Sequence, residues 1–283
     1  MIQCREIQAD DFENVVALLN EGFGPRNYRV DALQRLADHR TPPGLPKYGY
    51  VLKQDQTLVG VVLLIFTEIH IGGRSHIRCN VSSWYVRPAF RAYASLLAMQ
   101  ASRHRNVIFF NVTPAPHTWP TLEALGFTRF AAGYMVAVPL LGPAAVRAHV
   151  GKLPPVIHPD RDLDQAEIDL LQQHQQYGCL SLICEADGQR FPFVFKLTRR
   201  HGGIRLALLV YCRDSETFVR FARPIGWFLL RRGCLLVKLD SNGPVPGLVG
   251  RYVDGRPKYR KGGDQVHLGD VAYSEEAMFQ YLG

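Results

Sequence analysis

The stretch WYVRPAFRAYASLL, from Trp84 to Leu97, begins like a strand and ends like a helix. Its aromatic and β-branched start is typical of strands, and its alanine- and leucine-rich end is typical of helices. Pro88 and Arg91 lie at the junction, and the junction contains no glycine. Proline suits the first turn of a helix, where its missing N–H costs nothing. The junction is therefore either a phosphate-holding turn or a strand that simply continues into a helix.

The bulk composition is that of a globular protein. The chain has 283 residues, 47% hydrophobic and 20% charged, and its length permits one large domain or two smaller ones. The longest apolar run, LVGVVLLIF at Leu58–Phe66, is far shorter than the roughly 20 residues of a membrane span. The N-terminus shows no signal-peptide pattern, so we expect a cytoplasmic protein without a membrane span.

Cysteine spacing and net charge limit the classes of site. The six cysteines form no C-x-x-C pair and most lie among apolar strand residues, which favours buried thiols and no metal. The net charge is +8, with one basic cluster, RPKYRKGG, at Arg256–Gly263. No recognition helix, zinc finger or aromatic RNA-binding signature accompanies this cluster. We therefore expect a solvated basic face and no nucleic-acid partner.

The first half of the chain alternates helices and strands. Hydrophobic periodicity predicts a helix over residues 9–24 and a shorter one over 30–40. The elements predicted after them are a hairpin at 48–66, a strand at 76–86, a helix at 88–104, a strand at 107–112 and a short helix at 118–125.

The second half repeats that order. Residues 151–160, GKLPPVIHPD, contain three prolines and are the predicted linker. The elements predicted beyond it are a helix at 162–176, a hairpin at 177–197, a strand at 204–213, a helix at 214–233 and a strand at 234–240.

The two halves also keep a common register. Tyr-Gly occurs at 48–49 and again 129 residues later at 177–178, and Asn111 and Asp240 share the same offset. We interpret this as an internal duplication. It predicts a first domain at 1–150 and a second at 161–283, both α/β.

Several residues of the first half match a known pattern. Val86, Pro88 and Arg91 form a V-x-P-x-x-R turn, Asn111 lies on the next strand, and LEALGF follows at Leu122–Phe127. This combination resembles the GCN5-related N-acetyltransferase superfamily, and the second half resembles it by layout alone. The resemblance implies two tandem domains of this type, each a mixed, mostly antiparallel sheet flanked by helices. It also implies acetyl-coenzyme A or another acyl-coenzyme A as co-substrate, and no metal.

The resemblance places coenzyme A at the V-x-P-x-x-R turn. A helix start carries unpaired N–H groups and partial positive charge, which suit a pyrophosphate, and Arg91 adds a permanent charge. The family's R-x-x-G-x-G/A pattern has no glycine here, so the backbone can approach the pyrophosphate less closely. In the second half, Asp214 at the equivalent helix start would occupy the donors, which indicates a degenerate domain. The residues implied to bind the cofactor are Val86, Arg87, Arg91, Ala92, Tyr93, Ala94 and Asn111.

The resemblance also places the acyl thioester between strands Asn80–Val86 and Val107–Thr113. The family often uses a tyrosine before Gly-Phe as the acid, but Leu122 stands there. Tyr85 and His117 are the predicted catalytic residues, and His117 fits a structural loop histidine equally well. Tyr134 is a further candidate acid. Ser82, Ser83 and Trp84 are candidate substrate residues, each of which also fits a structural role.

The implied activity is transfer of an acyl group from acyl-coenzyme A to a small-molecule amine. Two alternatives stay open. The duplication also fits an aminoacyl transferase of the FemAB type. Loss of the acid tyrosine and of the glycines also fits a non-catalytic protein that binds or senses acyl-coenzyme A.

Overall fold

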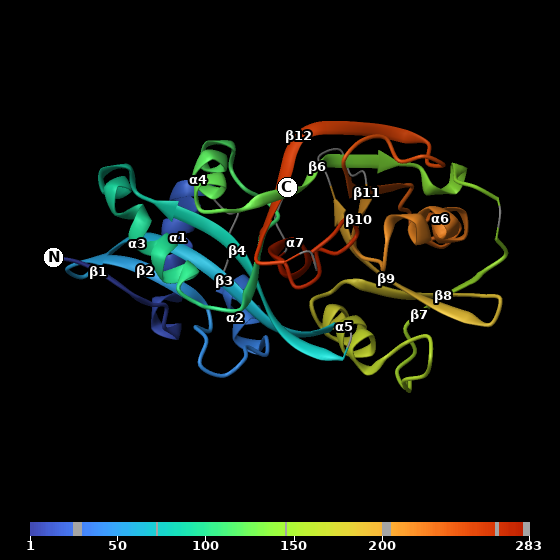
Figure 1. Ribbon diagram of the computed structural model, residues 1–283, viewed down its shortest axis with the longest axis horizontal. Helices are drawn as coiled ribbons and strands as arrows, with labels where there is room; N and C mark the ends of the chain where they lie inside the picture. The colour runs from blue at the N-terminus through green and yellow to red at the C-terminus, as the bar shows by residue number, and fades with distance from the viewer. Residues whose placement is uncertain (25–29, 72, 145, 200–204, 264–265, 280–283) are drawn as a thin grey trace. The chain divides into compact units, whose positions relative to one another are not determined.

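The computed structural model describes residues 1–24, 30–71, 73–144, 146–199, 205–263 and 266–279. Contacts divide the chain into two compact units (Figure 1). Unit 1 contains Met1–Phe127, Arg260–Gly263 and Tyr273–Leu282, and unit 2 contains Thr128–Tyr259 and Asp264–Ala272. This division differs from the predicted boundaries at 1–150 and 161–283, because residues 128–150 lie in unit 2 and the C-terminal segment lies in unit 1.

Unit 1 is built on a sheet with the strand order β1-β2-β3-β4-β5. Neighbouring strands are antiparallel except for β4 and β5, which are parallel. The predicted hairpin and the two strands after it are confirmed, whereas β1 is not among the predicted elements. The strand bounds are β1 (Ile2–Glu6), β2 (Gly49–Gln54), β3 (Thr57–Ile71), β4 (Arg74–Val86) and β5 (Val107–Asn111).

Helices of unit 1 follow the predicted periodicity, but two of them begin with a 3-10 segment, Ala9–Asp11 before α1 and Pro88–Tyr93 before α3, and α7 is not among the predicted elements. The prediction of an α-helix from residue 88 is wrong, because Pro88–Tyr93 forms a 3-10 helix, η2, and the α-helix begins at Ala94. No side chain caps η2 and none of its residues is buried, so neither capping nor packing favours α geometry there. The helix bounds are η1 (Ala9–Asp11), α1 (Phe12–Phe23), α2 (Val30–Asp38), α3 (Ala94–Ser102), η3 (Pro116–Thr118), α4 (Trp119–Ala124) and α7 (Glu275–Met278).

Unit 2 has the strand order β12-β6-β11-β10-β9-β8-β7. β10 and β11 are parallel, and the pairs from β9 through β8 to β7 are antiparallel. Its core lies between the sheet and α6, whose Phe218, Phe221, Ile225 and Leu229 are fully buried. The bounds are β6 (Thr128–Ala137), η4 (Pro139–Leu141), β7 (His149–Lys152), α5 (Gln165–Gln176), β8 (Leu180–Ala186), β9 (Gln189–Arg199), β10 (Arg205–Tyr211), α6 (Ser215–Leu230), β11 (Leu236–Ser241) and β12 (Gly250–Lys261).

The two units share one strand pattern. In each, an antiparallel hairpin leads to a third antiparallel strand, and a helix connects that strand to a parallel fourth strand. The predicted offset carries β5, Val107–Asn111, onto residues 236–240, and β11 is Leu236–Ser241. The predicted strand at 204–213 is confirmed over Arg205–Tyr211, and residue 204 lies outside the described residues. This correspondence supports the duplication, which itself stays a prediction.

The burial of individual side chains tests the predictions for the cysteines and for the basic cluster. Five of the six cysteines are buried, as predicted, and Cys4 is partly exposed. The solvated basic face predicted at Arg256–Gly263 is wrong for Lys258, which is buried on β12 with its Nζ 3.0 Å from Oδ2 of Asp240. A buried ammonium group requires such a partner. Asp240 is distant in sequence, so the spacing of the cluster does not indicate the pair.

Removing one partner of this pair should be costly. Lys258→Met leaves the carboxylate of Asp240 buried without its cation and should lower the free energy of unfolding by about 3–5 kcal/mol. The double variant Lys258→Met/Asp240→Leu should recover most of that loss. Urea denaturation followed by circular dichroism measures both. A Lys258→Met protein as stable as the wild type would show that the pair contributes nothing.

Candidate active site

Strands β4 and β5 stop pairing part-way along β4. Their ladder runs from Ile77 opposite Val107 to Asn80 opposite Phe110, while β4 continues to Val86. Pairing therefore ends in the region where the gap between these strands is predicted. Beyond that point, β4 has a backbone edge that faces no β5 partner, and such an edge can bond an extended ligand.

A β-bulge distorts β4 at the same place. Ser83 and Trp84 together lie opposite a single residue of β3, Val62. Ser83 has a φ angle of +52°, which non-glycine residues rarely adopt, and its Oγ lies 2.8 Å from Oγ of Ser82. Bulges and strained residues concentrate at functional sites. The three predicted substrate residues thus occupy an irregular segment of a central strand.

A carboxylate from α1 holds the end of β4. Glu21 accepts a hydrogen bond from the Tyr85 hydroxyl at 3.2 Å and forms an ion pair with Arg87, whose Nη2 lies 2.9 Å from Oε2. Gly22 lets α1 approach, because a Cβ there would lie 2.3 Å from the Tyr85 ring. Burial, and then the Glu21 carboxylate, raise the pKa of Tyr85 above its usual value near 10. Tyr85 is therefore protonated at neutral pH.

Unit 2 repeats this clamp with different residues. Tyr211 and Arg213 have the same Tyr-x-Arg spacing at the end of β10, and Glu167 on α5 contacts both, at 3.1 Å from the hydroxyl and 2.6 Å from Nη2. Burial, and then Glu167, raise the pKa of Tyr211. Asp214 caps α6 by accepting a bond from the N–H of Thr217 at 2.6 Å, so this helix start is occupied as predicted.

The predicted phosphate turn is exposed. Arg91 and Ala92 are exposed, and Tyr93 is 43% exposed. The side chain of Arg91 makes no hydrogen bond or ion pair with a described residue. One backbone donor of the turn is already used, because the N–H of Phe90 bonds the carbonyl of Arg87 at 2.8 Å. The exposed side chain of Arg91 is available to bind an anion.

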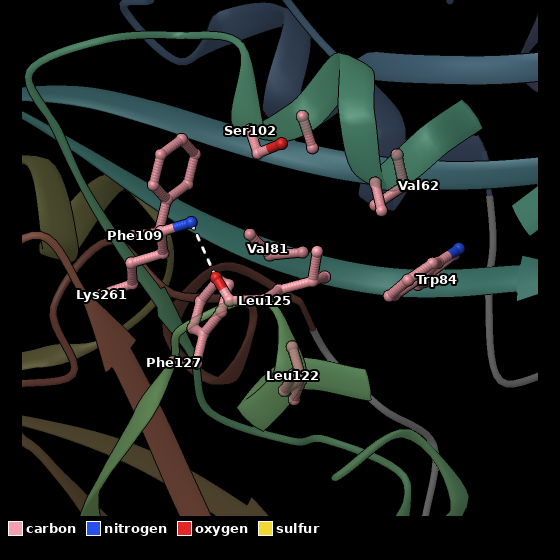
Figure 2. A pocket seen from close by; sticks show the side chains of 11 residues that line it. Val62, Val81, Trp84, Ser102, Phe109, Leu122, Leu125, Phe127 and Lys261 are labelled. Atoms are coloured by element: carbon pink, nitrogen blue, oxygen red, sulfur yellow. Dashed lines mark hydrogen bonds between the residues drawn. The ribbon is translucent and has the colours of Figure 1, made fainter. Parts of the chain in front are cut away.

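A narrow apolar pocket lies beside the bulge (Figure 2). Trp84 stands at one end, and Phe109, Phe127 and Lys261 stand at the other. Its volume is about 30 Å³, room for roughly one water molecule. Leu122, at the position of the family's tyrosine, is 1% exposed and is part of the apolar wall. The other lining residues are Val62, Val81, Ala98, Ala101, Ser102 and Leu125.

The fold of this chain is similar to that of several solved structures. No family model and no curated protein matches the sequence. A GCN5-related N-acetyltransferase from Anabaena variabilis matches in structure with a TM-score of 0.60 and 11% identity, over 92% of this chain and 72% of that one. A putative acetyltransferase from Pyrococcus horikoshii matches with a TM-score of 0.54 and 11% identity, over 96% and 93%. N-myristoyltransferase from Saccharomyces cerevisiae, with bound myristoyl-CoA, matches with a TM-score of 0.51 and 13% identity, over 92% and 82%.

The chain has the GCN5-related N-acetyltransferase fold. This confirms the predicted fold class of mixed sheets flanked by helices, while the tandem character of the halves stays a prediction. None of the described helices is long and apolar enough to cross a membrane. The described residues contain no group of three or more His, Cys, Asp or Glu that could hold a metal ion.

In this fold, some of the predicted site residues lie at the ends of two neighbouring strands, whereas His117 and Tyr134 lie elsewhere. The β4 residues from Ser82 to Val86 and the buried Asn111 lie at the ends of neighbouring strands of unit 1. His117 is exposed on η3, away from regular strands. Tyr134 belongs to β6 of unit 2, where the Nζ of Lys238 lies 4.6 Å from its ring centre.

Two residues of this fold, Glu21 and Glu275, are not predicted from the sequence, and Lys261 is predicted only as part of a solvated basic face. Glu21 is an unremarked helix residue until Tyr85 and Arg87 contact it. Lys261 donates a hydrogen bond to the carbonyl of Leu125 at 2.8 Å from the end of β12. Glu275, 1% exposed on α7, accepts a hydrogen bond from Oγ1 of Thr113. The last two come from segments that return to unit 1 after the chain has passed through unit 2, and no local pattern indicates such a return.

Strain at the bulge can be measured directly. Ser83→Gly should raise the free energy of unfolding by about 1 kcal/mol, because glycine adopts a positive φ without steric cost. The matched control is Ser82→Gly in the paired part of β4, which should lower it by about 0.5–1 kcal/mol. Urea denaturation measures both. Equal losses in the two variants would show that Ser83 carries no strain.

Proposed function

We propose that the protein transfers an acyl group from acyl-coenzyme A to a small-molecule amine at the gap between β4 and β5. The observation that carries the proposal is the coincidence, in unit 1, of a strand gap, a bulge, an apolar pocket and an exposed arginine turn. The solved structures that share the fold include N-acetyltransferases and an N-myristoyltransferase with bound myristoyl-CoA, which supports the same reaction class here.

The residues present fit coenzyme A. Arg91 is exposed and can make charge-assisted bonds to the pyrophosphate. Val86, Ala92, Tyr93 and Ala94 form the rest of the proposed coenzyme A turn. Asn111, buried at the end of β5, completes the proposed set. Arg87 is engaged with Glu21, so we assign it to holding the end of β4 rather than to the phosphate.

The apolar pocket beside Trp84 is the proposed place for the acyl group. Its volume of about 30 Å³ favours a short acyl group such as acetyl over a long chain. Ser82, Ser83 and Trp84 lie along the strand segment that an acceptor would approach.

The bound co-substrate supplies an activated thioester, and the chain supplies positioning and proton transfer. An amine can attack the thioester carbonyl directly, so the reaction needs no covalent enzyme intermediate. Backbone N–H groups on the unpaired edge of β4 would polarise the carbonyl. Tyr85, kept protonated and oriented by Glu21, is the proposed acid for the departing thiolate, and His117 is the second candidate.

Coenzyme A affinity should depend on Arg91. Arg91→Ala should weaken binding by about 1.5–3 kcal/mol, the range for hydrogen bonds to charged groups. Arg105→Ala is the matched control, because it removes the same charge from an exposed site just beyond α3 and should leave affinity unchanged. Isothermal titration calorimetry measures both. Unchanged affinity in a folded Arg91→Ala protein would reject the turn as the coenzyme A site, and binding without turnover over a panel of amines would identify a sensor instead.

Turnover should depend on one proton donor. Tyr85→Phe should lower kcat by about a hundredfold, whereas His117→Ala should have little effect. Because the pKa of Tyr85 is raised above 10, the wild-type rate should show no loss of the acid up to pH 9. Steady-state rates across pH 6 to 9 test this. The reverse ranking would assign the acid to His117, and wild-type rates in both variants would leave proton transfer to water or substrate.

A further inference from the structure

Helix α6 and strand β7 of unit 2, both labelled in Figure 1, border a surface groove. Its volume is about 480 Å³, far larger than that of the apolar pocket in unit 1. The catalytic proposal uses none of its residues. The groove is lined by Ala148, His149 and Val150 at β7, by Pro224, Trp227 and Phe228 on α6, and by Arg231 at the C-terminal end of that helix.

The outward face of α6 is aromatic and cationic. Arg223, Trp227 and Arg231 recur every four residues and therefore lie along one face of the helix. All three are exposed, and Trp227 is 49% exposed. Neither arginine forms an ion pair with an acidic side chain among the described residues. A half-exposed tryptophan between two unpaired cations is typical of a recognition surface.

Strand β7 presents an open backbone edge beside this face. It is the last strand of the unit 2 sheet. Leu153 donates its N–H to the carbonyl of Ser181 on the β8 side at 3.0 Å, one position beyond the pair of Lys152 and Leu182. Because successive residues of an antiparallel strand bond on alternate sides, the N–H groups of Lys152 and Val150 point away from β8. An extended peptide could pair with them.

We propose that this groove binds an extended acidic peptide segment of a partner protein. The segment adds as a strand to β7, rests an apolar side chain on Trp227, and places carboxylates near Arg223 and Arg231. Charge complementarity selects this occupant, since Arg231 and Trp227 line the groove beside a strand edge that supplies main-chain bonds, and Arg223 lies one helical turn away on the same face. The inference concerns unit 2 alone and does not depend on acyl transfer.

Strand addition has a specific test. The probe is a fluorescein-labelled acidic peptide with a central phenylalanine, and its lysine-substituted counterpart is the charge control. The full chain should bind the acidic peptide and not the basic one in fluorescence anisotropy at physiological salt. Trp227→Ala and Arg231→Glu should each weaken binding at least about tenfold.

The decisive variant is Lys152→Pro, with Lys152→Ala as its matched control. Proline removes an outward N–H and no bond to β8, so affinity should fall about tenfold, whereas Lys152→Ala keeps that N–H and should bind nearly as well as wild type. Thermal unfolding confirms that each variant is folded. Equal affinity of the two Lys152 variants would overturn strand addition. Absence of binding, or binding of labelled oligouridine in place of the peptide, would overturn an acidic peptide as the occupant.

Discussion

The parallel pairing of β4 with β5 constrains the rest of unit 1. Two parallel strands cannot be joined by a tight turn, so the chain must cross over the sheet between them. Here η2 and α3 make the crossing, which brings the Pro88 junction to the carboxyl end of β4. The ladder ends at Asn80, so the last six residues of β4 before the junction have no partner on β5. One topological requirement therefore brings together a backbone edge, an apolar pocket and an exposed arginine.

The sequence predicts elements well where the signal is local. Helix α1 follows from apolar spacing and ends at Gly24, and the hairpin of β2 and β3 follows from an apolar run after a polar turn. Strand β12 is missed because its glycines, proline and charges are typical of a loop, although Lys258 and Tyr259 are buried within it. What stabilises β12 is its pairing with strands distant in sequence, which no local pattern contains.

In the candidate site as well, the sequence predicts residues of a local motif but not residues that reach the site through tertiary contacts. Tyr85, Val86 and Arg91 are predicted because they belong to one short motif. Glu21, which orients Tyr85, and Lys261, which closes the pocket, are reached only through tertiary contacts. The α start expected at Pro88 fails for a physical reason, since the segment is exposed and no side chain caps it. The two Tyr-x-Arg clamps show that both units secure a strand end in one way, while Asp214 leaves the start of α6 no room for an anion.

The return of the chain to unit 1 has a consequence for biosynthesis. Unit 1 starts at Met1 but also needs Arg260–Gly263 and the segment from Tyr273, including Lys261 and Glu275. Ribosomes deliver residues in order, so the first 127 residues emerge long before the pieces that complete their unit. Most of unit 2, by contrast, is one continuous stretch. Because unit 2 is itself completed by Asp264–Ala272, both units await the last part of the chain, and unit 1, which emerges first, waits longest.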